Sequence, residues 1–190
     1  LLIYIFNMNI FRLFIIFFLV NVFILPVQSS QKIALNELFN QLKKVNNSKT
    51  AYLLEKRIWD IWHKHPNNIK LTDKLEFGIE LMNYGNYDYA IEVFSNVITT
   101  DPEWSEAWNK RATVFFLTNQ YKKSLNDIEK VLNIESRHFG ALSGQARIYI
   151  KLQEYEKAII SLKKALKFYP TFRSGELIPK IERLIQEESI

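Results

Sequence analysis

The sequence predicts an all-α protein built as a solenoid of antiparallel helix hairpins. Apolar residues recur at helical spacing through most of the 190 residues, and a pattern of large, small and aromatic positions repeats every 34 residues from Leu71 to Phe172. Only 5 Gly and 5 Pro are present, so long flexible linkers are not expected. A single hairpin cannot bury its apolar faces, whereas stacked copies bury them jointly.

The bulk composition excludes several classes of protein. The chain has no cysteine, which excludes disulfides, thiolate metal ligands and a cysteine nucleophile. Its net charge of +5 comes from interspersed signs, with 25 Lys and Arg against 20 Asp and Glu. Nucleic-acid-binding proteins concentrate basic residues together with aromatic ones, and the sequence has no such cluster. We therefore expect no nucleic-acid partner.

Residues 1–29 are predicted to be a secretory signal peptide, with translation starting at Met8. Arg12 supplies the positive charge, Leu13–Leu25 forms the apolar segment, and small residues follow, which places cleavage after Ser29. The apolar run is shorter than the roughly 20 residues that a spanning helix needs. The protein is therefore expected to be exported to the periplasm. An uncleaved inner-membrane anchor is the alternative, and it is the only way in which we expect membrane contact.

Residues 30–70 are predicted to form a degenerate N-terminal copy of the hairpin. The stretch LNELFNQLKKV supplies an amphipathic first helix. The second helix carries Ala51 where the full copies carry tyrosine, and Leu54 where they carry a small residue. These departures, together with a two-residue insertion at Ile69-Lys70, make this copy the least regular one.

Three full copies are predicted at residues 71–104, 105–138 and 139–172. In each, an amphipathic helix is followed by a turn, such as Gly85-Asn86, and by a second helix that stops near Asp101-Pro102 or its equivalent. The clearest repeated positions are a tyrosine at Tyr87, Tyr121 and Tyr155, and a small residue at Gly78, Ala112 and Ala146.

The last segment, residues 173–190, is predicted to be a capping helix. Pro179 suits a first helical turn, and Ile181, Leu184 and Ile185 form a short apolar stripe with charges opposite. A solenoid needs such a helix to cover the exposed face of its last repeat.

The repeated pattern resembles the tetratricopeptide repeat (TPR). The residues that carry the resemblance are Gly78, Tyr87, Ala90, Phe94, Pro102 and Trp108. The segments EAWNKRAT and RHFGALSG are also similar to segments of exported proteobacterial TPR proteins. This similarity favours a Gram-negative source and a periplasmic location.

The resemblance implies a protein-interaction module that holds a peptide or protein segment in a concave groove lined by the first helix of each hairpin. The residues expected to line that groove are Leu75, Ile79, Met82, Asn109, Lys110, Thr113, Phe116, Gly140, Ser143, Gly144 and Arg147. The alternative is a structural subunit of an envelope complex that acts through its convex or terminal faces. No nucleophile elbow, phosphate loop or zinc-protease motif is present, so we expect neither an enzyme nor a cofactor or metal.

The basic clamp that TPR proteins use to grip a peptide's C-terminal carboxylate is not expected. The matching positions hold Leu75, Ile79, Lys110, Gly140 and Gly144, of which only Lys110 is basic. This argues against a heat-shock-type cochaperone.

Two glycines in one predicted helix turn raise a question, because glycine inside a helix costs roughly 1 kcal/mol relative to alanine. Gly140 and Gly144 either allow the helix around Ile128–Leu132 to pack closely or allow a ligand backbone to approach. Both interpretations stay open at the level of the sequence.

Arg111 and Gln145 occupy the column of Phe77, which is normally apolar in the family. A buried arginine needs an acidic partner, and Glu80, Asp127 and Glu135 are the candidates. A structural salt bridge is favoured over contact with an acidic peptide.

The three histidines are interpreted as structural. Asp60, His63 and His65 could in principle share a metal, but histidines at a helix C-terminus are favoured by the helix dipole alone. His138 is expected to pack between repeats. Trp104 is expected in the core, with a place on a binding rim as the alternative.

Overall fold

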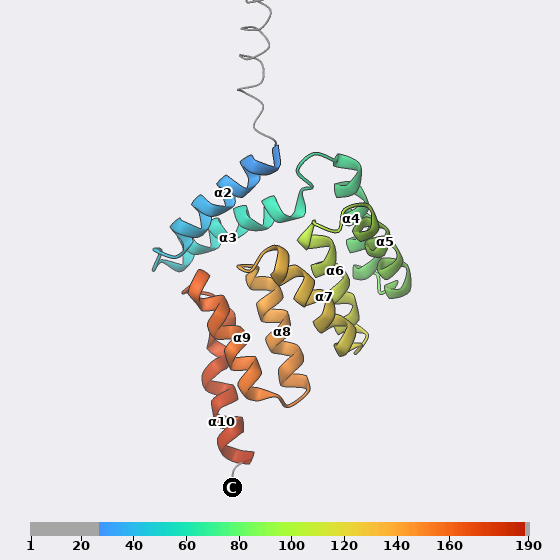
Figure 1. Ribbon diagram of the computed structural model, residues 1–190. Helices are drawn as coiled ribbons and strands as arrows, with labels where there is room; N and C mark the ends of the chain where they lie inside the picture. The colour runs from blue at the N-terminus through green and yellow to red at the C-terminus, as the bar shows by residue number, and fades with distance from the viewer. Residues whose placement is uncertain (1–26, 189–190) are drawn as a thin grey trace, which may run out of the picture.

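The computed structural model describes residues 27–188, and this part of the chain is helical without any β-strand. The predicted signal peptide lies outside the described residues except for its last three, which begin the first described helix. In order, the elements are α2 (Val27–Leu42), α3 (Ser48–His63), α4 (Ile69–Asn83), α5 (Tyr87–Thr100), α6 (Ser105–Leu117), α7 (Tyr121–Ile134), α8 (Phe139–Lys151), α9 (Tyr155–Phe168), the 3-10 helix η1 (Arg173–Leu177) and α10 (Ile178–Glu188). The predicted all-α class is confirmed (Figure 1).

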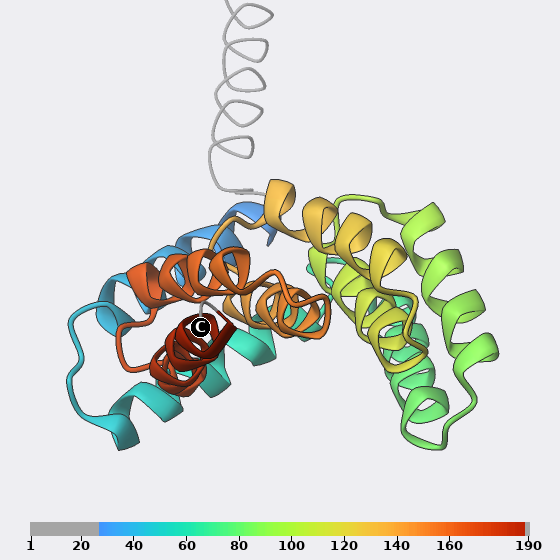
Figure 2. The same ribbon diagram turned by 90° about the horizontal axis from the view of Figure 1, so that it is seen from below.

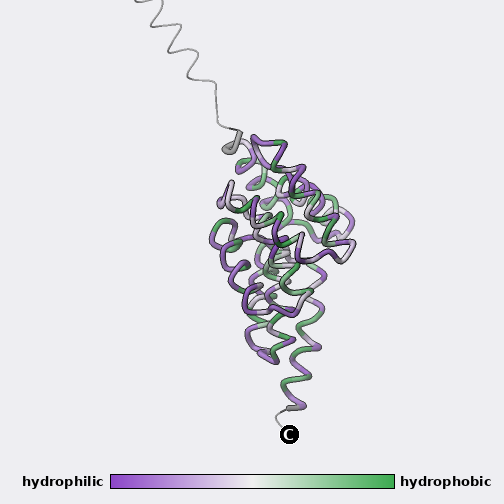
Figure 3. The backbone as a smooth tube through the Cα atoms, turned by 90° about the vertical axis from the view of Figure 1, so that its right-hand side faces the viewer, coloured by the Kyte–Doolittle hydropathy of each residue, from purple (hydrophilic) through white to green (hydrophobic). Residues whose placement is uncertain are grey.

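Helices α4 to α9 form three antiparallel hairpins that stack side by side (Figure 1). Below, residues 71–104, 105–138 and 139–172 are called the first, second and third repeat. Polar and apolar residues alternate along each helix, so every helix has one face to bury (Figure 3). Close approach within the first hairpin depends on Gly78, because a Cβ there would lie 2.5 Å from the Phe94 ring.

The three turns inside the hairpins share one conformation. Gly85, Asn119 and Gln153, each 34 residues apart, have φ angles of 77°, 58° and 59°. The next amide in each turn reaches back to close the helix end, as when Asn86 N donates to Leu81 O at 2.8 Å. This left-handed C-terminal cap satisfies carbonyls that the helix leaves unpaired.

Helix α10 covers the last repeat, as predicted. Ile181 is 2% exposed and packs with Leu177, Ile178 and Ile185 against α8 and α9, where Leu162 is fully buried. Leu184, the third residue of the expected stripe, is 38% exposed and contributes less.

The N-terminal hairpin forms, but its apolar face does not pack as a fourth copy ahead of the first repeat. The buried residues of α2 and α3 share one core with the third repeat instead, through Phe139 at the start of α8 and Tyr169 after α9. The Phe39 ring of α2 lies 6.3 Å from the Phe139 ring and 6.5 Å from the ring of Phe168, the last residue of α9. Figure 2 shows the N-terminal hairpin on the side of α9 and α10, away from α5. Leu54, which stands in the column of Ala90, is itself buried in this shared core.

None of the helices in the described part of the chain combines the length and the apolar character needed to span a bilayer.

Candidate peptide-binding cleft

A cleft of about 360 Å³ opens between α6 and α8. Its floor is apolar, because Ala112, Ile128, Ala141 and Ile148 are buried beneath it. Seven of the eleven residues predicted to line the groove lie on this cleft: Asn109, Thr113, Phe116, Gly140, Ser143, Gly144 and Arg147.

Two segments outside the repeated first helices close the cleft. Glu55 and Trp59 of α3 form one boundary, and Phe172 and Ser174, which follow α9, form another. Trp59 is fixed in place because its Nε1 donates to Glu55 Oε1 at 3.3 Å. The sequence places α3 outside the groove, and only the folding of the N-terminal hairpin onto the third repeat brings it here.

Polar groups on the cleft wall retain capacity for further hydrogen bonds. Thr113 Oγ1 donates to Asn109 O at 2.9 Å, and its two lone pairs remain available as acceptors. Ser143 Oγ and Ser174 Oγ lie 2.9 Å apart, so one of them accepts and the other donates. Arg147 is exposed and has no charged or hydrogen-bonding partner within the described residues. The cleft therefore offers hydroxyl groups and one unpaired cation above an apolar floor.

The two glycines of α8 have different surroundings in the structure. A Cβ on Gly140 would lie 2.5 Å from Trp59 Cη2, so this glycine makes room for the indole of α3. A Cβ on Gly144 would meet only Ile128 Cδ1, at an ordinary contact distance of 3.7 Å. Packing therefore explains Gly140, with Trp59 as the neighbour in place of the expected Ile128–Leu132 helix. It does not require glycine at position 144.

Three predicted groove residues lie away from the cleft. Leu75 is fully buried in the core of the first repeat, where it packs between α4, α5 and α6, so its expected place on an open groove is wrong. Ile79 and Met82 are half-buried against the same core and do not line the cleft. These three apolar residues therefore stabilise the first repeat.

Lys110, the remaining predicted groove residue, is turned toward the protein. Its Nζ lies 3.0 Å from Glu106 Oε1 and 5.7 Å from the centre of the Trp59 ring. This lysine is therefore engaged in the interior beside the cleft, and Arg147 is the free cation.

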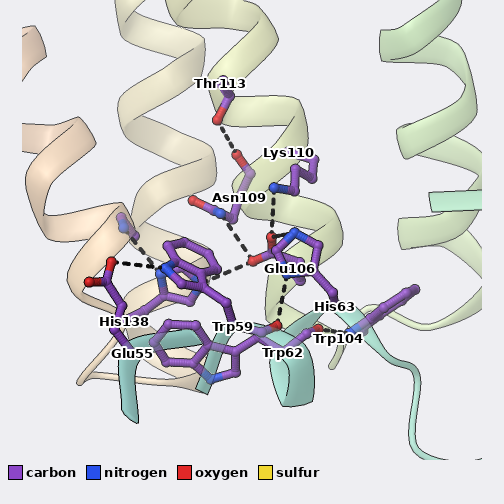
Figure 4. A network of polar contacts seen from close by, with 11 residues as sticks. Glu55, Trp59, Trp62, His63, Trp104, Glu106, Asn109, Lys110, Thr113 and His138 are labelled. Carbon is purple, nitrogen blue, oxygen red and sulfur yellow. Dashed lines mark hydrogen bonds and ion pairs between the residues drawn. The ribbon is translucent and has the colours of Figure 1, made fainter. Parts of the chain in front are cut away.

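A buried carboxylate organises the base of the cleft (Figure 4). Glu106 is fully buried, and its Oε2 accepts hydrogen bonds from Asn109 Nδ2 at 3.0 Å and His138 Nε2 at 3.1 Å. Its Oε1 faces Lys110 Nζ and, at 3.2 Å, His63 Nε2. Four side chains from α3, α6 and the start of α8 thus converge on one carboxylate.

The Glu106 carboxylate stays ionised despite its burial. Burial by itself raises the pKa, but Lys110, His138 and His63 together outweigh it and lower the pKa of Glu106 to about 2. Glu106 also lies in the first turn of α6, where the helix dipole favours a negative charge.

The protonation of His138 follows from its partners. Its Nδ1 accepts from Ala141 N at 3.1 Å, so the proton of the neutral ring sits on Nε2 and is donated to Glu106. The ring also stacks on Trp62 with centroids 4.0 Å apart. His138 therefore joins the repeats as expected, and it also caps α8.

The other sequence candidates are structural. Arg111 makes a two-pronged pair with Asp127, at 2.8 and 2.9 Å, and donates to Ser95 Oγ, which confirms the predicted salt bridge. In the same column, Gln145 Oε1 accepts from Ser161 Oγ at 2.8 Å.

The histidine-rich helix end has two separate sets of partners. His63 faces Trp59 O and Glu106, whereas His65 Nε2 lies 2.7 Å from Asp101 Oδ2. Among the described residues no group of three or more His, Cys, Asp or Glu is placed to hold a metal ion. Trp104 is 7% exposed and donates to Trp62 O at 2.9 Å, which places it in the core and not on a rim.

Sequence reasoning missed Glu106 as the centre of this network. One signal was available: a carboxylate stands there in the column that holds Thr72 and Gly140 in the other copies. Lys110 lies one turn away in the same helix, but His63 and His138 come from distant segments, so the column alone does not reveal the network.

Comparisons with known proteins agree with this architecture. A family model described as "Anaphase-promoting complex, cyclosome, subunit 3" matches residues 83–165. A TPR repeat-containing protein of Rhizobium etli is 32% identical over 148 residues, which cover 78% of this chain and 72% of that protein.

Solved TPR domains share the fold at low sequence identity. The first TPR domain of Spaghetti (RPAP3), bound to an HSP90 peptide, is similar with a TM-score of 0.60 and 20% identity, over 63% of this chain and 96% of that one. The TPR2B domain of yeast Sti1, in complex with an Hsp70 peptide, has a TM-score of 0.54 and 19% identity, over 64% of this chain and 98% of that one. Together with the repeat geometry, these similarities establish that the chain belongs to the TPR repeat-containing proteins, a family of protein-interaction modules.

Proposed function

We propose that this chain binds an extended segment of a partner protein in the cleft between α6 and α8. The observation that carries the proposal is the cleft itself, in which an apolar floor, unsatisfied hydroxyl acceptors and the exposed Arg147 face the same space. Binding sites for ligands are concave and mostly apolar, with a few polar groups that fix orientation.

The chemistry of the cleft selects for one kind of segment. An apolar side chain would cover Ile128 and Ile148 on the floor, and a carboxylate in the segment would pair with Arg147 at the rim. Gly144 allows the backbone of the segment to come close to α8. The solved TPR complexes with HSP90 and Hsp70 peptides support peptide binding as a mode for this fold.

A peptide-display selection tests this proposal. The full chain is used to select from a random library of extended peptides, and the selected sequences are then measured against the Arg147→Glu variant. We expect selected peptides to pair an acidic with an apolar residue and to lose at least about tenfold in affinity to the variant, the equivalent of about 1.4 kcal/mol. Selected peptides that bind wild type and variant equally would place the binding site elsewhere.

Export to the periplasm is part of the same proposal. It rests on the apolar segment that follows Arg12 and precedes Ser29. Fractionation of cells that express the full chain tests it: recovery from the periplasm supports export, and recovery from the cytoplasm contradicts it.

A further inference from the structure

The outer edge of the first repeat is uncovered although it is rich in aromatic residues. Phe77, Tyr84 and Tyr89 have 54%, 81% and 67% of their surface exposed. They belong to α4 and α5, which form one end of the stack (Figures 1 and 3). We call these three residues and the exposed carboxylates around them the first-repeat edge; the carboxylates are Asp73, Glu76, Glu80, Asp88 and Glu92.

The internal repeats show what this edge normally faces. At the junction of the first and second repeats, Arg111 reaches Ser95 on α5, so the column of Phe77 faces the second helix of the preceding repeat. The internal copies hold polar residues there: Arg111 and Gln145 stand in the column of Phe77, and Lys123 and Lys157 in the column of Tyr89. A terminal repeat needs a polar outer face for solubility, yet this one exchanges polar residues for aromatic ones.

The edge also belongs to the most acidic of the three repeats. The first repeat has seven Asp and Glu against one Lys, a net charge of −6, whereas the whole chain is +5. Within the described residues, none of the five exposed carboxylates of the edge takes part in an ion pair.

A complementary face lies at the other end of the same molecule. Helix α3 exposes Tyr52 and Leu53, at 62% and 55%, with Lys56 and Arg57 one turn further on. Residues 30–70 carry eight Lys and Arg against three Asp and Glu, a net charge of +5. Asp60 is the one acidic residue on this exposed face of α3, and the face ends there. The beginning of α3 and the first-repeat edge lie at opposite ends of the molecule, so they cannot meet within one chain (Figure 1).

We propose that the first-repeat edge of one molecule receives the exposed face of α3 from a second copy, in a head-to-tail contact. Aromatic residues would pack on Tyr52 and Leu53, and Lys56 and Arg57 would pair with the carboxylates of the edge. A symmetric contact between two first-repeat edges is disfavoured, because it would oppose two surfaces of the same sign. The contact is therefore heterologous and adds molecules in one direction.

Sedimentation velocity of the full chain with two charge-reversed variants tests the contact. Lys56→Glu/Arg57→Glu makes both faces acidic. Glu76→Lys/Glu80→Lys/Glu92→Lys makes both faces basic, because the three lysines then outweigh Asp73 and Asp88 on the edge. Each variant alone is therefore expected to stay monomeric. In an equal mixture every acidic face again meets a basic one, and association is expected to return. All the substituted residues are exposed, so the fold should tolerate them.

The wild-type protein is expected to show a mass that rises with concentration and falls back to the monomer as salt screens the charges. Lys163→Glu/Lys164→Glu on α9 is the matched control, with the same change in net charge at exposed positions away from both faces. It should associate as the wild type does. A wild type that is monomeric at low salt, a mixture that fails to associate, or a control that dissociates equally would each overturn the proposal.

The absence of native cysteine permits a second test. A chain with both Tyr52→Cys and Phe77→Cys should give a ladder of multimers with a bis-maleimide, whereas Phe77→Cys alone should give monomer. Dimers from Phe77→Cys alone would show a symmetric contact and contradict the head-to-tail arrangement.

Discussion

A single residue, Gly140, lets α3 pack closely at the edge of the cleft. Substituting each of the two glycines of α8 measures how much this close packing contributes to stability. Gly140→Ala drives a methyl group into the Trp59 ring, and we expect it to lower the free energy of unfolding by about 1–3 kcal/mol. Gly144→Ala adds an ordinary contact to Ile128 and should raise it by about 0.5–1 kcal/mol, because alanine is the better helix former. Urea unfolding of both variants measures whether the free energy of unfolding falls for Gly140→Ala and rises for Gly144→Ala. Equal effects would show that Trp59 is not fixed against Gly140.

The buried carboxylate predicts a pH dependence of stability. The pKa of Glu106 is lowered from 4.5 to about 2 in the folded protein, so the unfolded chain takes up its proton first. The stability that this carboxylate contributes is complete above pH 4.5 and disappears as the pH falls toward 2. The contribution amounts to about 3 kcal/mol.

Glu106→Gln isolates this effect. We expect the variant to be less stable than the wild type at pH 7, since Lys110 and His63 lose their counter-charge, and the difference should shrink steadily below pH 4.5. Chemical unfolding of both proteins across this range measures the difference. A stability difference that stays constant with pH would mean that Glu106 is not the titrating group.

Among the elements, the hairpin turns were the most predictable part of the structure. The pattern of 34 residues placed the helices of all three repeats, because a small residue, a turn and a helix stop recur in each. The pattern does not reveal the backbone strain in the turns, since only the first copy has glycine at the left-handed position.

Gln153→Gly tests this strain. Gln153 has a φ of 59°, a conformation that costs a residue with a Cβ but not glycine. We expect the variant to gain about 0.5–1 kcal/mol in the free energy of unfolding. The matched change Gln145→Gly, inside α8, should lose stability; a loss in both variants would argue against strain in the turn.

The N-terminal hairpin shows where prediction from the sequence stopped. Its helices were foreseen because they are amphipathic, whereas its docking site was not. That site depends on Phe139 and Gly140, which look like ordinary repeat positions until Trp59 is placed beside them. The sequence also did not show which side chains of the first helices face the protein: Leu75 is core, Ile79 and Met82 are half-buried against it, and Lys110 is turned toward Glu106.

At the scale of the whole molecule, the N-terminal hairpin and the third repeat share one core, and we expect them to unfold together. Phe139 is fully buried between Tyr169 and two residues of the N-terminal hairpin, Phe39 and Trp59, which lie 100 and 80 residues earlier in the chain. We expect Phe139→Ala to cost about 3–5 kcal/mol and to reduce the hydrogen-exchange protection of α2 and α3 together with that of α8. Phe94→Ala in the first repeat, an equally buried control, should leave α2 and α3 closer to wild type. If Phe139→Ala leaves the hydrogen-exchange protection of α3 unchanged, the N-terminal hairpin and the third repeat unfold independently.

The two candidate interaction surfaces of the molecule are the cleft and the first-repeat edge. The cleft holds one free cation above an apolar floor, and the first-repeat edge lies on helices that do not line it. The other face of the proposed contact is on α3, which also forms one boundary of the cleft through Glu55 and Trp59.

The central claim, that a partner segment occupies the cleft, is tested most directly by photo-crosslinking in cells. A photoreactive amino acid replaces Thr113 on the cleft wall in one full-length variant, and Lys163 on the outer side of α9 in another. If a segment occupies the cleft, position 113 gives a discrete adduct that is absent from position 163 and is lost when Arg147→Glu is added. Adducts from position 163 alone would contradict it and assign binding to the convex face.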